Sequence, residues 1–269
     1  LLVGTKGSLV ETKEAKKIIT NTNVGLIATK AGGTAGATAQ NDGSIVSTRN
    51  SGIGIYTTES TGNSTGTITM QKVSSVGILG ENNSTLTNSG KIELQKDKSA
   101  GIYGKDSDVT NSGTGTKGIY VKDEKSAGIY GLLTSTASAD KTLNNTGLVK
   151  VENDTKSGSA GIYAKVKDAK SIQNAGTINV GTAANTTDTQ GAGIYGEVVS
   201  GGTGVLAIGN TSNINIDLNG SVGIFAKNGT GSAGNLTVSN TGTITAKKEN
   251  SVGILSEKST VTSSGTVIL

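Results

Sequence analysis

The chain has 269 residues, of which 24 are basic and 20 are acidic, and its net charge is +4. It contains no histidine, cysteine, proline or tryptophan, which excludes a disulfide framework, a thiolate metal site and a Ser-His-Asp triad. Aromatic residues make up only 3% of the chain. This excludes a large globular core of aromatic side chains and leaves a narrow core filled by many aliphatic side chains. The chain has no basic run with interleaved aromatic residues, which is the pattern that would indicate nucleic-acid binding.

The residues up to 24 are the least regular part of the chain, and they predict an irregular first coil. From residue 25 to 269 a short motif recurs, in forms such as Ser-Val-Gly-Ile-Leu-Gly at 75–80 and Ser-Ala-Gly-Ile-Tyr-Gly at 99–104. Such recurrence is typical of a solenoid, and because the pattern is already running at both ends we expect an excerpt of a longer chain. The central glycines lie 23 to 33 residues apart, at Gly25, Gly54, Gly77, Gly101, Gly128, Gly161, Gly193, Gly223 and Gly253.

Each copy is followed by Asn-x-Gly and then by alternating apolar and polar residues, as in 86–94 and 172–180. Alternation indicates a strand with one buried face, and Asn-x-Gly between two such runs indicates a turn. Strands this short cannot bury their apolar faces alone, so each coil must stack on its neighbours. The prediction is an all-β fold: a right-handed parallel β-solenoid of about nine rungs, in a single elongated domain.

In-register stacking predicts three internal apolar columns and a ladder of asparagines. The first column holds Ile78, Ile102, Ile129, Ile162, Ile194, Ile224 and Ile254. The second holds Val109, Leu143, Ile172, Leu236 or Val238, and Val261, and the third holds Ile92, Ile178, Ile244 and Val267. The ladder holds Asn88, Asn111, Asn145, Asn174 and Asn240.

An aromatic column is the first candidate binding surface, and it contains Tyr103, Tyr130, Tyr163, Tyr195 and Phe225 together with Tyr56. If the preceding isoleucine points inward, strand alternation turns these rings outward, where they can stack on sugars or contact a protein. The alternative is that a bend at the glycine or an adjacent loop buries them. Ile27, Leu79 and Leu255 at the same position favour burial.

Insertions after the conserved strand supply the rest of the candidate surface, because equivalent insertions in stacked coils lie on one side of a solenoid. They span 132–140, 197–204 and 229–234, and a second set spans 153–158 and 182–190; the first repeat has its own loop at 30–39. The candidate binding residues in or beside them are Leu132, Leu133, Glu197, Val198 and Asn228.

Covalent chemistry is not expected, and no catalytic, cofactor-binding or metal-binding residue is predicted. A pectin-cleaving hydrolase needs paired acids and commonly a histidine, and a lyase on such a scaffold usually needs a basic residue and clustered acids. The only arginine is Arg49. The closest carboxylate pairs, Asp106 with Asp108 and Asp123 with Glu124, lie in lysine-rich turns and are interpreted as solvated surface. No Gly-Lys-Ser/Thr phosphate loop is present.

The repeats S-[VA]-G-I-[YLF]-[AG] and N-[ST]-G-x-I-x-[VL] resemble those in passenger regions of type V autotransporter adhesins, especially the very large adhesins of fusobacteria. The resemblance extends from about Val24 to Leu269. It implies secretion, display on the bacterial cell surface, and a tether to the outer membrane through a β-barrel outside this segment. It also implies attachment to a host cell-surface protein or glycan, or to partner bacteria.

Three functions are therefore open. The segment mediates or supports attachment itself, or it is a structural stalk that presents a distal binding domain, or it is an enzyme acting on polysaccharides. Tight regular rungs favour the stalk, whereas clustered insertions favour a binding site in this segment. The enzyme is the least expected of the three.

Overall fold

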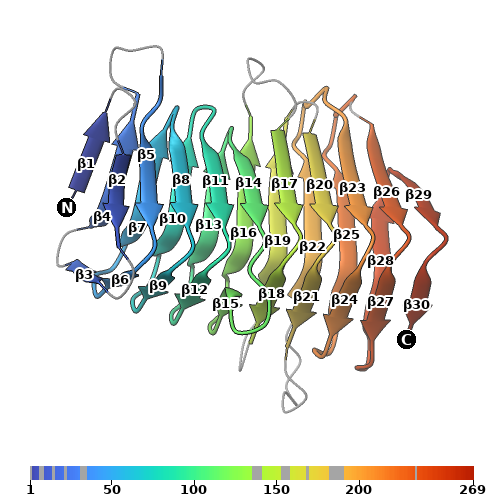
Figure 1. Ribbon diagram of the computed structural model, residues 1–269. Coiled ribbons are helices and arrows are strands. Elements are labelled where there is room, and N and C mark those ends of the chain that lie inside the picture. The colour runs from blue at the N-terminus through green and yellow to red at the C-terminus, as the bar shows by residue number, and fades with distance from the viewer. Residues whose placement is uncertain are drawn as a thin grey trace.

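The coils are built from short strands in which buried and outward-facing residues alternate. The computed structural model describes residues 2–5, 9–13, 16–20, 23–30, 35–134, 141–152, 158–167, 170–181, 191–233 and 235–269. The strands form three parallel sheets of ten strands each, and the two termini lie at opposite ends of the stack (Figure 1). The predicted all-β parallel β-solenoid is confirmed.

Each coil contributes one strand to each sheet, and the sheets are named A, B and C in the order in which the chain enters them. Sheet A contains β1 (Leu2–Thr5), β4 (Val24–Thr29), β7 (Ile53–Thr58), β10 (Val76–Glu81), β13 (Ala100–Lys105), β16 (Ala127–Leu133), β19 (Ser159–Val166), β22 (Gly191–Val198), β25 (Val222–Asn228) and β28 (Val252–Glu257). Sheet B contains β2 (Leu9–Thr12), β5 (Thr38–Asn41), β8 (Thr61–Ser64), β11 (Thr85–Asn88), β14 (Asp108–Asn111), β17 (Lys141–Asn145), β20 (Lys170–Asn174), β23 (Leu206–Asn210), β26 (Leu236–Asn240) and β29 (Thr260–Ser263). Sheet C contains β3 (Lys17–Thr20), β6 (Ser44–Ser47), β9 (Thr67–Met70), β12 (Lys91–Leu94), β15 (Gly118–Val121), β18 (Leu148–Val151), β21 (Thr177–Val180), β24 (Asn213–Ile216), β27 (Thr243–Ala246) and β30 (Thr266–Ile268).

The described part of the chain has one coil more than the nine expected. The residues before Val24, predicted as an irregular first coil, supply β1, β2 and β3, which pair in register with β4, β5 and β6. The sequence pattern is weak there because the first coil lacks the Gly-Ile-Tyr motif. Its backbone pairing is nevertheless the same as in the later coils.

The three apolar columns lie inside the solenoid, as predicted. Ile102 pairs with Ile78 and Ile129, Val109 with Leu86 and Leu143, and Ile92 with Ile68 and Ile119. In the second column the register selects Val238, which pairs with Ile208 and Val261, whereas Leu236 pairs with Leu206. The columns end at the last coil, where Val261 and Val267 are 42% and 41% exposed because no further coil covers them.

The asparagine ladder runs along the corner between sheets B and C and is longer than predicted. It also includes Asn210, whose turn reads Asn-Thr-Ser, and Asn41 extends the same corner by donating to Ser64 over 3.0 Å. The rungs from each side-chain amide nitrogen to the next amide oxygen measure 2.9 Å (Asn88 to Asn111), 2.8 Å (Asn111 to Asn145), 2.8 Å (Asn145 to Asn174), 2.7 Å (Asn174 to Asn210) and 2.7 Å (Asn210 to Asn240). Because these groups are buried, each rung also satisfies donors and acceptors that water cannot reach.

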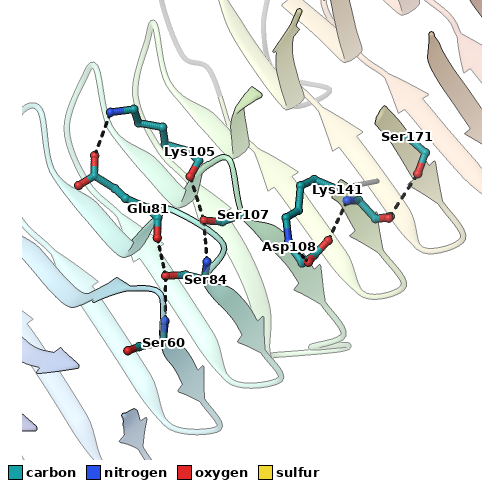
Figure 2. A network of polar contacts seen from close by, with 9 residues as sticks. Ser60, Glu81, Ser84, Lys105, Ser107, Asp108, Lys141 and Ser171 are labelled. Atoms are coloured by element: carbon teal, nitrogen blue, oxygen red, sulfur yellow. Dashed lines mark hydrogen bonds and ion pairs between the residues drawn. The ribbon is translucent and has the colours of Figure 1, made fainter. Parts of the chain in front are cut away.

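Two serine ladders, which the sequence pattern did not single out, line the other corners. Between sheets A and B, the backbone nitrogens of Ser60 and Ser84 donate to the hydroxyls of Ser84 and Ser107 over 3.4 Å and 3.2 Å (Figure 2). Between sheets C and A, the nitrogens of Ser75 and Ser99 donate in the same way to the hydroxyls one coil further on, over 3.2 Å and 3.0 Å. In the coils that carry these serines, each corner is joined to the equivalent corner of the next coil by a polar ladder.

Strands β16, β19 and β22, at seven, eight and eight residues, are longer than the earlier strands of sheet A, which have four to six residues. Their extra residues continue the alternation, so Leu133, Val166 and Val198 form a further internal column at 0% exposure. Part of the predicted insertions at 132–140 and 197–204 is therefore strand. Residues 31–34, 135–140, 153–157, 182–190 and 234, which carry much of the other insertions, lie outside the described residues.

Candidate functional site

The outer face of sheet A is shaped by the central glycine of each repeat. A Cβ atom on Gly101 would lie 2.5 Å from Cγ2 of Ile119 and 2.5 Å from the carbonyl oxygen of Gly128, so only glycine lets the backbone approach the core so closely. The next residue, Ile102, is also fully buried. Two successive inward positions break the alternation like a bulge, so Ala100 and Tyr103 lie on the outer side.

The aromatic column forms a continuous stack on this face from Tyr103 to Phe225, and Leu79 separates Tyr56 from it. Ring centroids lie 5.0 Å apart between Tyr103 and Tyr130, 4.9 Å between Tyr130 and Tyr163, and 4.7 Å between Tyr163 and Tyr195, with interplanar angles of 21°, 17° and 4°. Phe225 closes the stack edge-on to Tyr195 at 5.1 Å. The spacing is close to the strand separation of ~4.8 Å, so the backbone register positions the rings.

The rings point away from the core, as alternation predicts, and each is partly buried. Their faces are covered by one another, and Leu79 pairs with Tyr103 in the preceding coil. The inner rings therefore present only edges and hydroxyls to solvent. This corrects the expectation that exposed ring faces stack on sugars, and it shows that the bend at the glycine does not place the rings in the core.

A groove runs beside the stack along the solenoid. It consists of two hollows of about 440 Å³ each, which share Gly158, Ala160 and Tyr163. The tyrosines form one wall, and the floor is a row of small residues in register: Ala100, Ala127, Ala160 and Ala192. The sequence carries this signal as an alanine three residues before Tyr103, Tyr130, Tyr163 and Tyr195, although the strand pattern alone does not distinguish these alanines from other strand residues.

Burial of the stack changes the acidity of its phenols. Desolvation by burial raises the pKa of Tyr103 and of Tyr130, and the neighbouring tyrosine adds to the effect in each case. The pKa of Tyr195 is raised by burial and by Glu197, whose carboxylate accepts a hydrogen bond from the phenol over 3.1 Å. The phenols therefore stay protonated, and able to donate hydrogen bonds, to higher pH than free tyrosine.

The remaining candidate residues divide between surface and core. Leu132, Glu197 and Asn228 lie partly exposed on strands of sheet A, and Lys165 contacts the Glu197 carboxylate at 3.8 Å. Leu133 and Val198 are fully buried, so their assignment to a binding surface is wrong. Both were placed in insertions, whereas alternation along β16 and β22 carries them inward.

Comparison with known protein families gives one match. Residues 58–207, more than half of the chain, match the family model of the BigA third pectate lyase-like domain. The chain belongs to this family. No curated protein and no solved structure matches this BigA-type domain.

The carboxylates of this BigA-type domain are used in structural contacts. Asp106 is 7% exposed and accepts a hydrogen bond from the backbone nitrogen of Thr134 over 2.8 Å, and Glu124 is 9% exposed, so the interpretation of both as solvated surface is wrong. Asp108 binds Lys141 and the backbone nitrogen of Thr142, each at 3.0 Å (Figure 2). These turns are more tightly packed than their lysine content suggested.

The other chemical features of the BigA-type domain are sparse. Burial and the adjacent Asp97 raise the pKa of Asp123. Arg49 is exposed in a turn near the N-terminal end. Within the described ranges, no group of three or more Asp and Glu side chains is arranged to hold a metal ion, and no helix is long and apolar enough to cross a membrane.

Proposed function

We propose that the chain is a passenger segment of a surface adhesin and that it mediates or supports attachment to host cells or to other bacteria. BigA, whose third pectate lyase-like domain gives the family its name, is an autotransporter-like surface adhesin. The proposed location is the bacterial cell surface, with the segment extracellular and tethered to the outer membrane. The closer likeness to the large fusobacterial adhesins belongs to the same proposal.

The observation that carries an adhesive role is the groove beside the tyrosine stack. It is apolar in its floor, polar along the phenol hydroxyls, and continuous over successive coils. Concave apolar surfaces with a few convergent polar groups are the usual form of binding sites. An ordinary stalk has no need of such a surface.

A structural stalk is the second candidate, and the three polar ladders favour it. Each ladder joins consecutive coils through buried hydrogen bonds, as at Ser84, Ser99 and Asn145. Such networks resist bending and shear between coils. The two roles are compatible, because a stiff rod can both present a distal domain and bind along its own side.

Catalysis is not part of the proposal, despite the pectate lyase-like name. The chain has no histidine, and its closest acid pairs bind backbone nitrogens and lysine rather than lining the groove. Incubation of the chain with polygalacturonate, followed by absorbance of unsaturated products, tests this point. Product formation above a buffer control would overturn it.

The adhesive role is tested by binding the labelled chain to epithelial cells and to partner bacteria. A variant with residues 134–140 and 199–204 shortened keeps the buried Leu133 and Val198 and so preserves the core. Saturable binding by the intact chain supports the proposal, and its loss on shortening places contacts in the loops. A folded chain that does not bind saturably would leave only the stalk.

A further inference from the structure

The charged residues around the groove are unevenly distributed. Lys98 and Lys125 are exposed and line the hollow beside Tyr103, Tyr130 and Tyr163. No acidic side chain is among the described residues that line either hollow. On the far side of the stack Lys165 lies 3.8 Å from the Glu197 carboxylate, so these two charges offset each other. Residues 153–157 and 182–190, which adjoin the groove in the chain, lie outside the described residues.

The carboxylates nearest to these lysines along the chain do not line the groove. Asp97 precedes Lys98 and contacts Asp123, two residues before Lys125. Glu124 is buried. Lys98 and Lys125 therefore carry the only charges among the described residues that line this hollow, and low-dielectric walls concentrate the field of such groups.

The floor offers no main-chain hydrogen bonds to a ligand. Strand β16 pairs on one side with β13 and on the other with β19, and the same holds for β19 with its neighbours. A peptide added to the groove would leave its own amides without partners, because strand addition requires a free sheet edge. A ligand whose polarity lies in hydroxyls and anionic groups meets no such penalty.

We propose that the groove binds a linear anionic glycan, laid along the solenoid axis. This proposal rests on the adhesive role and specifies its ligand class. Lys98 and Lys125 pair with carboxylates or sulfates, while the phenol hydroxyls of Tyr103 and Tyr130 bond to sugar hydroxyls. The alanine methyls and ring edges contact the apolar C–H faces of the sugars. The coils repeat every ~4.8 Å, close to the length of one pyranose in an extended chain, so successive sugars meet equivalent positions.

The test measures binding of the whole chain to three immobilised polymers: heparin, polygalacturonate and neutral dextran. The charge variant is Lys98→Gln with Lys125→Gln. Its matched control is Lys150→Gln with Lys247→Gln, which removes the same charge beside a separate hollow over sheet C. A third variant, Tyr130→Leu with Tyr163→Leu, changes no charge and uses a residue that the column itself accepts at Leu79 and Leu255.

We expect the intact chain to bind at least one polyanion and not dextran, and affinity to fall as salt rises toward about 1 M. The groove charge variant should bind about tenfold more weakly, equivalent to ~1.4 kcal/mol. The tyrosine variant should also weaken binding, and the control should stay within about twofold of the intact chain. Binding to polygalacturonate would show that carboxylates are sufficient. Binding to heparin but not to polygalacturonate would show that sulfates are required.

Equal loss in the groove variant and its control would show general attraction to a cationic protein and overturn the proposal. Equal binding to dextran, or no binding to either polyanion, would do the same. Circular dichroism of every variant separates loss of binding from loss of folding. Saturable attachment to cells without glycan binding would overturn the glycan proposal while leaving the adhesive role intact.

Discussion

At the scale of single residues, the asparagine ladder is the clearest example of a side chain fixed by its position in the coil. Asn145 is fully buried, donates to Asn174 and to the carbonyl oxygen of Gly147, and accepts from Asn111. Its neighbour Asn144 lies on the same strand and pairs with Thr110, but the Asn144 side chain is on the outer face and is partly exposed. The two residues differ by burial and not by type.

This contrast gives a matched pair of variants. Asn145→Ala removes two rungs and leaves the amide of Asn111 and the oxygen of Asn174 short of one buried partner each, so we expect a loss of about 2–4 kcal/mol in the free energy of unfolding. Asn144→Ala should stay within about 0.5 kcal/mol of the parent chain. Urea titration followed by circular dichroism measures both. Similar losses in the two variants would contradict the ladder.

A second residue, Glu93, links stability to acid. Its burial disfavours the charged carboxylate, but hydrogen bonds from Lys122, Lys91 and Gln95 outweigh that effect and lower the pKa of Glu93 from 4.5 to about 2. A carboxyl with a lowered pKa stabilises the fold above its unfolded pKa, and that contribution disappears as pH falls toward the folded value.

We therefore expect the unfolding midpoint in urea to fall between about pH 5 and pH 2, with Glu93 contributing part of the slope. Glu93→Gln should reduce the pH dependence of the urea midpoint between about pH 5 and pH 2 and should leave the pH dependence near neutral pH unchanged. The control is Glu249→Gln, at a turn position after β27. A slope in Glu93→Gln identical to that of the parent chain would contradict the assignment.

At the scale of the strands, the tyrosine stack follows from strand register and repeat length. The stacked pairs Tyr103–Tyr130, Tyr130–Tyr163 and Tyr163–Tyr195 are each separated by one coil, so in-register pairing alone brings the rings together. Raised phenol pKa values give this arrangement a measurable signature.

The signature is a native tyrosinate titration displaced to alkaline pH. Burial and neighbouring groups raise the pKa of Tyr103, Tyr130 and Tyr195, so the folded chain should form less tyrosinate than the urea-unfolded chain at any pH near 10–11. Because the unfolded state loses these protons first, stability should fall as pH rises above about 10. Absorbance near the tyrosinate band measures both titrations, and coincident curves would contradict a buried stack.

The alternation at this scale also explains how much the sequence could predict. Period-two patterns placed the columns of Ile102, Val109 and Ile92 inside, and the same pattern turned Tyr103 outward. It could not predict that the ring faces are covered, because that depends on side-chain rotamers in adjacent coils. The sequence does not predict the inward turn of Leu133 and Val198, because no residue marks where the strand ends and the insertion begins, so strand length had to come from the structure.

At the scale of the whole molecule, the solenoid has two open ends. Leu2 and Leu9 are 45% and 58% exposed at one end, and Leu255 and Val261 are 41% and 42% exposed at the other. The outer edges of β1–β3 and of β28–β30 carry no neighbouring strand in the described chain. Uncovered edges of this kind promote end-to-end pairing.

We expect the isolated 269-residue chain to associate end to end, with a mass by light scattering that rises with concentration. A variant with Val261→Lys and Val267→Lys places charges on the terminal edge and should shift the chain toward monomer. The control is Thr110→Lys with Ser239→Lys, which places the same two charges on an outer face. A clean monomer at high concentration would contradict the prediction.

We propose that this solenoid carries an adhesive surface and is not only a spacer. The most direct measurement is displacement of the labelled chain from cells by increasing unlabelled chain. We expect a saturable, fully competed signal that is weakened by Tyr130→Leu with Tyr163→Leu. A signal that does not saturate or compete, from a chain that circular dichroism shows to be folded, would contradict the adhesive role and leave only the stalk.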